Sequence, residues 1–346
     1  MSTALTPPAL PAQRSDDVPR LGDAKVTSRV NAVHIVASID GAAASDTAVH
    51  VRKDQHVTLY AVIRAGDAYF SDAPEPHVAG KRLAVQPLVR GPAIDVTWNR
   101  IEPAAASLSN TASGTFRFEP IEYRATAIAG TANHASIVPD VRPTLTPDHG
   151  DGVGTMRYQL VVRQADRTFA TPGPEARRGK GSGGLTDAVT RVTIRRDDSY
   201  LGFLTEMYGQ PYIWASAGTS DKTHQSERLE GSDCADLMVY GARRMGKHIA
   251  YTWTGGLPGI TTLVASGTRG DDGIYRDKDG TPVPFTQPGD LVLFPRHVGA
   301  LAADKGTKGV LDDHDLMLHT LFDSPKEQAI VDTGYAQYPI ELRRFR

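Results

Sequence analysis

The feature that most constrains the fold of this chain is a long succession of short alternating segments between Val26 and Asp197. Apolar and polar residues alternate within each segment, and glycine, proline, aspartate and asparagine separate the segments. Examples are residues 33–37, 57–63, 158–162 and 189–194. A two-residue period places successive side chains on opposite faces of a strand. The pattern therefore predicts a β-rich module, either a barrel or a sandwich, with the immunoglobulin-like sandwich as one form.

A different pattern begins after this module and contains the only cysteine of the chain, Cys234. Ser232 or Asp233 can cap a helix that begins at the cysteine. One face of that helix is apolar and predicted to be buried; its residues are Leu237, Met238, Gly241 and Met245. A helix N-terminus stabilises negative charge, and a thiol reacts as its thiolate. The position of Cys234 therefore predicts a lowered thiol pKa.

A lone cysteine is often only a small buried hydrophobic residue. The surrounding sequence therefore has to distinguish a structural from a catalytic role. Here a Gly-Ser-Asp turn leads into Cys234, and a histidine-bearing segment, His297-Val298-Gly299, follows much later. A nucleophile and a base that are distant in sequence and adjacent after folding are typical of cysteine hydrolases. His297 also follows the apolar segment 289–294 after a short turn, as a hairpin partner would. These features favour the catalytic interpretation.

Four motifs occur in order along the second part of the chain. They are YGQPYIW at 208–214, GSDCADL at 231–237 followed by Tyr240 and Gly246, PGDLVLF at 288–294, and HVGAL at 297–301. Together they resemble NlpC-type cell-wall peptidases, a bacterial branch of the papain-like cysteine hydrolases. The resemblance covers residues 198–346 and implies a papain-like domain of helices packed on a small antiparallel β-barrel. The predicted fold class is therefore α+β, with this domain preceded by the β-rich module.

The resemblance also implies the roles of individual side chains. Cys234 is the expected nucleophile, and His297 is the expected general base. Tyr212 is an expected hydrogen-bonding neighbour, whose hydroxyl could join the backbone N–H of Cys234 in binding the oxyanion. The family places a polar residue on the next strand to orient the base, and His319 is the best match for it here.

A second arrangement of the base remains open in the sequence. It uses His314 as the base and Asp332 as the residue that orients it. His314, however, is flanked by aspartates at 312, 313 and 315, a composition typical of a solvated turn. We therefore rank this arrangement below the one built on His297.

The expected chemistry is hydrolysis of an amide through a thioester. The base takes the thiol proton, the thiolate attacks the carbonyl, and water then releases the acyl group. The resemblance implies stem peptides of bacterial peptidoglycan as the substrate. The same thioester could serve an acyltransferase or a deamidase instead. A third alternative is a β-rich binding protein whose catalytic domain has lost activity.

Composition and missing motifs limit other function classes. The formal net charge of −2 provides no basic field for nucleic acid. No run approaches the ~20 apolar residues that span a bilayer, so no membrane span is predicted. Closely spaced cysteine or histidine pairs and a phosphate-binding glycine loop are also missing, so we predict neither a metal nor a cofactor. The sequence leaves the oligomeric state open.

At 346 residues the chain is expected to form more than one domain. We predict a disordered segment at 1–25, which has several prolines and no signal-peptide core. The β-rich module follows at 26–197, and the catalytic domain at 198–346. Within the latter we expect a helix from Ser199 to Tyr208 and a groove-bordering loop at 255–286. The resemblance implies an extracytoplasmic place of action, in the periplasm, at the cell wall or as a secreted enzyme.

Overall fold

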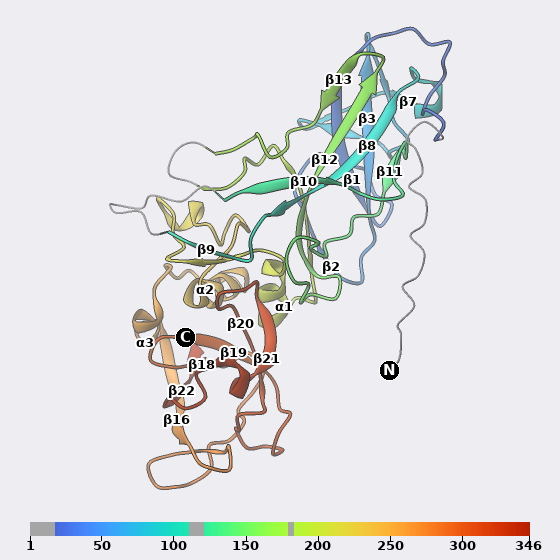
Figure 1. Cartoon of the computed structure of the whole chain (residues 1–346). Coiled ribbons are helices and arrows are strands. Elements are labelled where there is room, and N and C mark those ends of the chain that lie inside the picture. Colours follow the sequence, from blue (N-terminus) through green and yellow to red (C-terminus); the bar gives the residue numbers. More distant parts are fainter. Residues whose placement is uncertain (1–17, 111–120, 179–182) are drawn as a thin grey trace, which may run out of the picture.

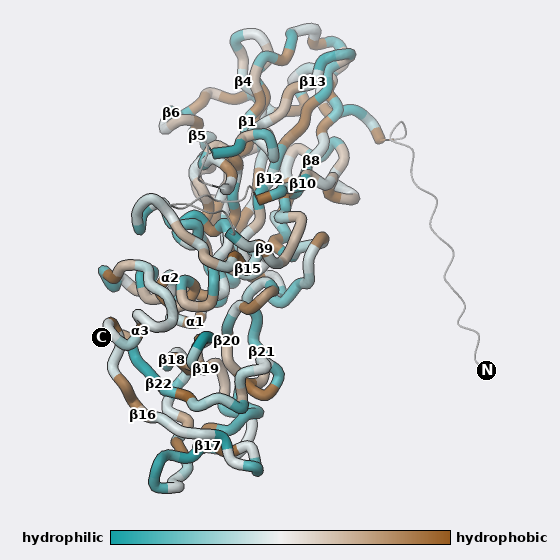
Figure 2. Tube along the Cα trace, turned by 60° about the vertical axis from the view of Figure 1, so that its left-hand side comes forward, coloured by the Kyte–Doolittle hydropathy of each residue, from teal (hydrophilic) through white to brown (hydrophobic). Residues whose placement is uncertain are grey.

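The computed structural model describes residues 18–110, 121–178 and 183–346. Most of the segment predicted to be disordered, 1–25, lies outside these described residues. Two β-rich parts lie at opposite ends of the molecule, and α1 (Tyr200–Leu204) and α2 (Cys234–Arg244) lie between them (Figure 1). A view turned about the vertical axis shows the same order of parts (Figure 2).

Two sheets pack against each other in the N-terminal part. The first has the order β1-β3-β4-β7, with β11 paired to β3; its strands are β1 (Val30–Ile39), β3 (Val57–Ala65), β4 (Ala68–Phe70), β7 (Val85–Gln86) and β11 (Ser136–Ile137). The second has the order β10-β8-β12-β14-β2, with β13 paired to β12; its strands are β10 (Tyr123–Ala127), β8 (Asp95–Pro103), β12 (Gly154–Gln164), β14 (Thr190–Arg195), β2 (Val49–Arg52) and β13 (Arg167–Ala170).

The core between these sheets follows from the alternation in the sequence. Alternate residues of β3, Leu59, Ala61 and Ile63, are buried against Trp98 of β8 and Tyr158 of β12. The two large aromatic residues bury their rings and still satisfy their polar atoms. Trp98 Nε1 donates to the carbonyl of His134 over 2.9 Å, and the Tyr158 hydroxyl donates to that of Asp140 over 2.8 Å.

The C-terminal part is a seven-stranded sheet that forms a half-barrel. Its order is β17-β16-β22-β18-β19-β20-β21; the strands are β16 (Thr261–Arg269), β17 (Tyr275–Arg276), β18 (Leu291–Leu293), β19 (Val298–Ala303), β20 (Leu316–His319), β21 (Lys326–Ala329) and β22 (Ile340–Phe345). One face packs on α2, where Leu237 and Met238 meet Val298 and Leu318. This packing brings the start of α2 to the ends of β19 and β20.

The remaining elements are short. Two small pairs are β5 (His77–Val78) with β6 (Lys81–Arg82) and β9 (Ser107–Ser109) with β15 (Tyr212–Trp214). The third α-helix is α3 (Leu257–Ile260), and the 3-10 turns are η2 (Leu88–Arg90), η3 (Thr205–Met207), η4 (Asp221–Thr223), η5 (Thr254–Gly256) and η6 (Ile330–Thr333). No helix of the described residues has the length and apolar character needed to cross a membrane.

The predicted fold class, α+β with a papain-like catalytic domain, is wrong. Strands account for 39% of the structure and helices for 11%, and the helices do not form a layer packed on a papain-like domain. The helix expected from Ser199 to Tyr208 ends at Leu204, and a 3-10 turn follows it. The segment expected to be a loop at 255–286 contains the nine-residue strand β16. Helical periodicity over a few residues did not determine how far each helix would extend.

Buried polar groups join the N-terminal β-rich part to the segment that carries η3 and α2. Glu206 of η3 is fully buried and accepts hydrogen bonds from Arg244 at 2.9 and 3.0 Å. Its carboxylate also accepts from the Tyr240 hydroxyl and lies 3.5 Å from Arg195 of β14. Arg157 of β12 donates to the carbonyl of Leu229 over 2.8 Å. The buried carboxylate is thus paired with charges from both β14 and α2, and this fixes α2 against the N-terminal sheets.

Candidate functional site

Helix α2 fixes the position of Cys234. Of the two candidate caps, Asp233 is the one used: its Oδ1 accepts the N–H groups of Ala235 and Asp236, each over 2.9 Å. The preceding turn needs glycine, because Gly231 has φ +141° and a Cβ there would lie 2.5 Å from the carbonyl oxygen of Pro211. Three of the four residues predicted for the buried face are buried. The fourth, Met245, is 48% exposed, because α2 ends one residue earlier.

The structure brings His297 and His319 together. His297 ends the tight turn after β18, where its carbonyl accepts the N–H of Phe294 over 2.8 Å, and His319 is the last residue of β20. The Nε2 atom of His297 lies 2.8 Å from Nδ1 of His319. Both rings are buried, and Nδ1 of His297 is buried without a hydrogen-bond partner among the described residues.

The sulfur of Cys234 lies against the residue that follows His297. The backbone N–H groups of Val298 and Ala235 lie near the sulfur and favour its charged form, and the side chain is buried. Burial nevertheless raises the thiol pKa well above its usual value, and the charge of Asp233 raises it further. The lowered pKa expected at a helix N-terminus is thus not what the structure supports. Desolvation outweighs the N–H groups here, so the resting thiol keeps its proton.

These environments assign a tautomer to the histidine pair. Burial lowers the pKa of His297, and it lowers that of His319 to about 4, so both rings are neutral at neutral pH. If Nδ1 of His297 is to accept a proton, its Nε2 must carry the hydrogen and donate it to Nδ1 of His319. The 2.8 Å contact fits that arrangement. A neutral thiol and a neutral imidazole are a suitable pair for general-base activation.

Tyr212, on β15, also lies near the cysteine. Burial raises its pKa, and Cys234 and Asp233 are close enough to add to the rise. Its hydroxyl therefore stays protonated and able to donate a hydrogen bond. Its ring packs edge-on against Phe322 at 5.4 Å between centroids.

Tyr335 is a neighbour of the site that the sequence did not single out. Its ring centroid lies 4.8 Å from that of His297. Burial raises its pKa, and the charge of a Cys234 thiolate would raise it further. It follows η6 in a turn with no recognisable motif. No sequence signal pointed to it, because the contact depends on how the loop after β21 folds back on the sheet.

A buried acidic pair underlies the first turn of α2. Burial raises the pKa of Asp233 to about 6 and that of Asp236 well above its usual value, and the two carboxyl groups interact. The Ser216 hydroxyl donates to Asp236 over 2.6 Å and accepts the N–H of Asp233 over 2.9 Å. His224 lies 3.5 Å from Asp236. The pair therefore holds a proton close to the sulfur, and this reduces the negative charge that opposes thiolate formation.

The alternative base does not reach the site in this structure. The His314 side chain is 74% exposed and lies 4.0 Å from Asp313 in a polar turn. Asp332 is exposed in η6. Neither is in contact with the pair formed by His297 and His319.

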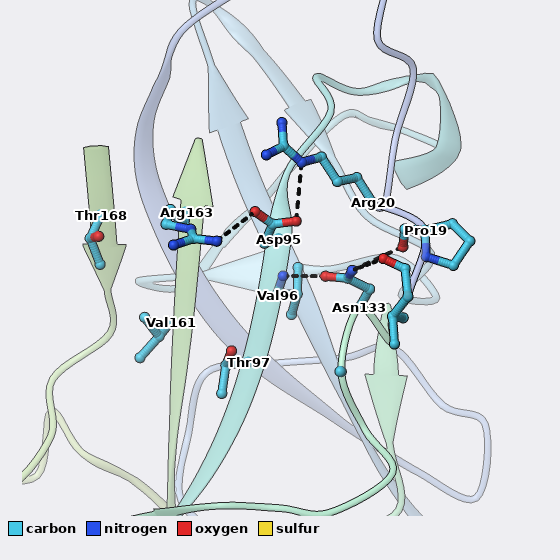
Figure 3. A pocket seen from close by; sticks show the side chains of 11 residues that line it. Pro19, Arg20, Asp95, Val96, Thr97, Asn133, Val161, Arg163 and Thr168 are labelled. Atoms are coloured by element: carbon cyan, nitrogen blue, oxygen red, sulfur yellow. Dashed lines mark hydrogen bonds and ion pairs between the residues drawn. The ribbon is translucent and has the colours of Figure 1, made fainter. Parts of the chain in front are cut away.

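The described part of the chain offers no metal site, and a sizeable cavity lies away from Cys234. Across residues 18–110, 121–178 and 183–346, no three His, Cys, Asp or Glu side chains are grouped to hold a metal ion. A cavity of about 710 Å³ lies on β8, β12 and β13, beside residues 18–20 (Figure 3). Its charges are satisfied internally, because Asp95 pairs with Arg20 at 3.3 Å and with Arg163 at 3.5 Å. The elements that carry Cys234 and the histidines do not line it.

Comparisons with family models, with curated proteins and with solved structures found no match to this chain. A function for the site therefore has to be argued from its own geometry and chemistry.

Proposed function

We propose that this protein is a cysteine hydrolase that cleaves amide bonds through a thioester. Cys234 is the nucleophile, His297 is the general base, and His319 orients the base. One observation carries the proposal: the residue after His297, Val298, lies against the sulfur of Cys234, while Nδ1 of His297 is buried without a partner among the described residues and its Nε2 contacts His319 at 2.8 Å. A nucleophile, a base and a group that orients the base are the parts that such chemistry needs.

In the first step Nδ1 of His297 takes the thiol proton as the sulfur attacks the carbonyl carbon. The resulting imidazolium is stabilised by its Nε2–H, which donates to Nδ1 of His319. It then gives its proton to the leaving amine as the C–N bond breaks. Water, activated by the same imidazole, attacks the thioester and restores the thiol.

The oxyanion needs donors on the side of the sulfur opposite the base. The backbone N–H of Cys234, at the first position of α2, has no intrahelical acceptor by virtue of its position. The protonated hydroxyl of Tyr212 is the second donor we assign. Donors of this kind, fixed before the reaction, stabilise the charge that develops in the transition state.

As substrate we propose stem peptides of bacterial peptidoglycan. Support for this choice comes from the motifs at 208–214, 231–237, 288–294 and 297–301, which resemble those of NlpC-type peptidases. The proposal concerns the chemistry and the substrate; it does not extend to a papain-like fold.

The test is release of fragments from purified peptidoglycan, followed by mass spectrometry. Wild type should release defined stem fragments whose masses sum to the parent plus one water, whereas Cys234→Ala and His297→Ala should release none. Equal release by Cys234→Ala would disprove the assignment of the nucleophile. No release by wild type, with Cys234 still open to alkylation, would point to a cysteine enzyme for another acyl substrate.

A further inference from the structure

We propose that Phe322 is a specificity-determining residue of this site, which receives an apolar side chain of the peptide substrate next to the bond that Cys234 attacks. The inference rests on the proposed cysteine hydrolase function and names a property of its substrate that the catalytic residues do not specify. Its basis is the position, exposure and support of this one aromatic ring.

Phe322 combines two features that packing alone does not explain. It is 70% exposed, and its backbone lies in the left-handed region at φ +53°. A bulky non-glycine residue in that region is strained, and a solvated turn would normally use glycine or asparagine there. Strain of this kind persists where the surrounding structure imposes it, and such positions cluster at functional sites.

The exposed ring lies beside the chemistry. It packs edge-on against Tyr212, at 5.4 Å between centroids and 66° between planes, and Tyr212 is close enough to Cys234 to respond to its charge. Trp214 is two residues farther along β15, on the same face of that strand as Tyr212, and is 53% exposed. Two exposed aromatic side chains therefore flank a buried tyrosine that neighbours the nucleophile. An apolar group of a bound peptide would remove both rings from water.

Hydrogen bonds within the loop and to a neighbouring segment fix the loop that carries Phe322. Within it, the Thr320 hydroxyl donates to the carbonyl of Asp323 over 2.7 Å. The Ser324 hydroxyl accepts the N–H of Gly209, just before β15, over 2.9 Å. The loop begins directly after His319, so the same strand end positions the base and the aromatic ring.

A residue of the N-terminal part also holds the loop that carries Phe322. His149, in the long connection between β11 and β12, lies 2.9 Å from Asp323, which Lys326 also contacts at 3.1 Å. The carboxylate of Asp323 thus ties the Phe322 loop to the β-rich module. His149 is accordingly a positioning residue: it acts on the substrate only through the loop.

Two alkylating reagents of different apolar character test the proposal without a known substrate. The rate of Cys234 modification by N-benzyl iodoacetamide is compared with that by iodoacetamide at one fixed pH, by intact-protein mass spectrometry. Because both reagents react with the same thiolate at the same pH, the ratio of the two rates does not depend on the fraction of Cys234 that is ionised. We expect the benzyl reagent to be favoured in wild type, and Phe322→Ser to reduce that preference by about threefold to tenfold, since loss of one apolar contact is worth about that much. Phe322→Leu should retain most of it.

Matched variants separate the roles. Val89→Ser removes an apolar side chain of similar exposure, 66%, from the β-rich module and should leave the ratio unchanged. His149→Ala should lower the preference part of the way, because it loosens the loop without removing the ring. Since Phe322 is mostly exposed, its variants are expected to keep the wild-type unfolding temperature, which is measured in parallel.

The outcomes for the two proposals are distinguishable. If Cys234 reacts but Phe322→Ser keeps the wild-type ratio, or wild type shows no preference for the benzyl reagent, Phe322 does not determine specificity and the hydrolase proposal stands. If Cys234 of the folded protein reacts with neither reagent after prolonged incubation, both proposals are overturned. The inference is supported if Phe322→Ser loses the preference for the benzyl reagent while Phe322→Leu and Val89→Ser keep it.

Discussion

At the scale of single residues, burial dominates the chemistry of the site. It raises the pKa of the Cys234 thiol and lowers the pKa values of both histidines, so each group is neutral before substrate binds. The contact between His297 and His319 uses Nε2 of His297 and leaves its Nδ1 available to act as the base. The mechanism we propose therefore depends on a neutral base rather than on a preformed ion pair.

The first prediction concerns the orienting histidine. His319→Ala should lower kcat by about 10²- to 10³-fold, within the range that general-base catalysis contributes, because His297 loses the acceptor that fixes its tautomer. His319→Asn keeps an acceptor oxygen and should recover part of the loss. The measurement is kcat on the released stem fragments. An equal loss in both variants would indicate that His319 serves packing alone.

The second prediction concerns pH. A base whose pKa is lowered from 6.5 stays unprotonated, and therefore active, as the pH falls below that value. The acid limb of kcat/KM should accordingly lie below pH 6.5, and the alkaline limb above the usual thiol range, because burial raises the thiol pKa. A pH profile on wild type checks both limbs. An acid limb at or above pH 6.5 would contradict the neutral pair.

The third prediction tests the proposed oxyanion donor. Tyr212→Phe keeps the ring that packs on Phe322 and removes only the hydroxyl. We expect kcat to fall by about 10²- to 10³-fold, the usual effect of removing one such donor, with KM little changed. Steady-state kinetics measure kcat and KM separately. A change in KM alone would place the hydroxyl in substrate binding instead.

At the scale of elements, local signals specified some parts and not others. The N-cap and buried face of α2 could be read from the sequence, because a cap and a periodic face are properties of neighbouring residues. The segment before Tyr212 and the segment at 255–286 were misjudged, since the competing structures depend on tertiary partners. Tyr335 and the polar contacts of Asp236 could not be found, because they join residues with no periodic relation.

The fourth prediction uses the helix cap. Asp233→Asn retains a good N-cap and removes a charge that raises the thiol pKa, whereas Asp233→Ala also removes the cap, at a cost of about 1 kcal/mol in the free energy of unfolding. The pH midpoint of Cys234 alkylation by iodoacetamide should therefore move down in Asp233→Asn with stability retained. An unchanged midpoint would show that Asp233 carries no charge near the sulfur.

At the scale of the whole molecule, buried charges join the N-terminal β-rich part to α2. Burial alone would raise the pKa of Glu206, but His50 at 3.9 Å and hydrogen bonds from Arg244 and Tyr240 lower it to about 2. A carboxylate with a lowered pKa stabilises the folded state above its unfolded pKa, and that stability is lost as the pH falls toward 2. Because Glu206 lies between β14 and α2, this stability belongs to the contact between these two elements.

The fifth prediction follows from this carboxylate. The free energy of unfolding of wild type should contain a component of about 3 kcal/mol that disappears between roughly pH 5 and pH 2, and Glu206→Gln should lack it. Urea unfolding at several pH values measures this. Glu122→Gln, at an exposed surface pair with Arg124, is the matched control and should preserve the wild-type pH dependence.

The parallel pairing of β9 with β15 has a consequence for biosynthesis. Ser107 lies opposite Tyr212, so the chain must be extended by 105 residues (212 − 107) before the first pair can form. At about 5–20 residues per second, the ribosome needs on the order of 5–20 s to supply that partner. Until then β9 lacks its partner, and it still lacks that partner after β10, β12 and β14 have completed the second sheet. Aggregation during expression is therefore expected to respond to the translation speed of this interval, and a charged residue at the exposed Ser107 or Ser109 would suppress it.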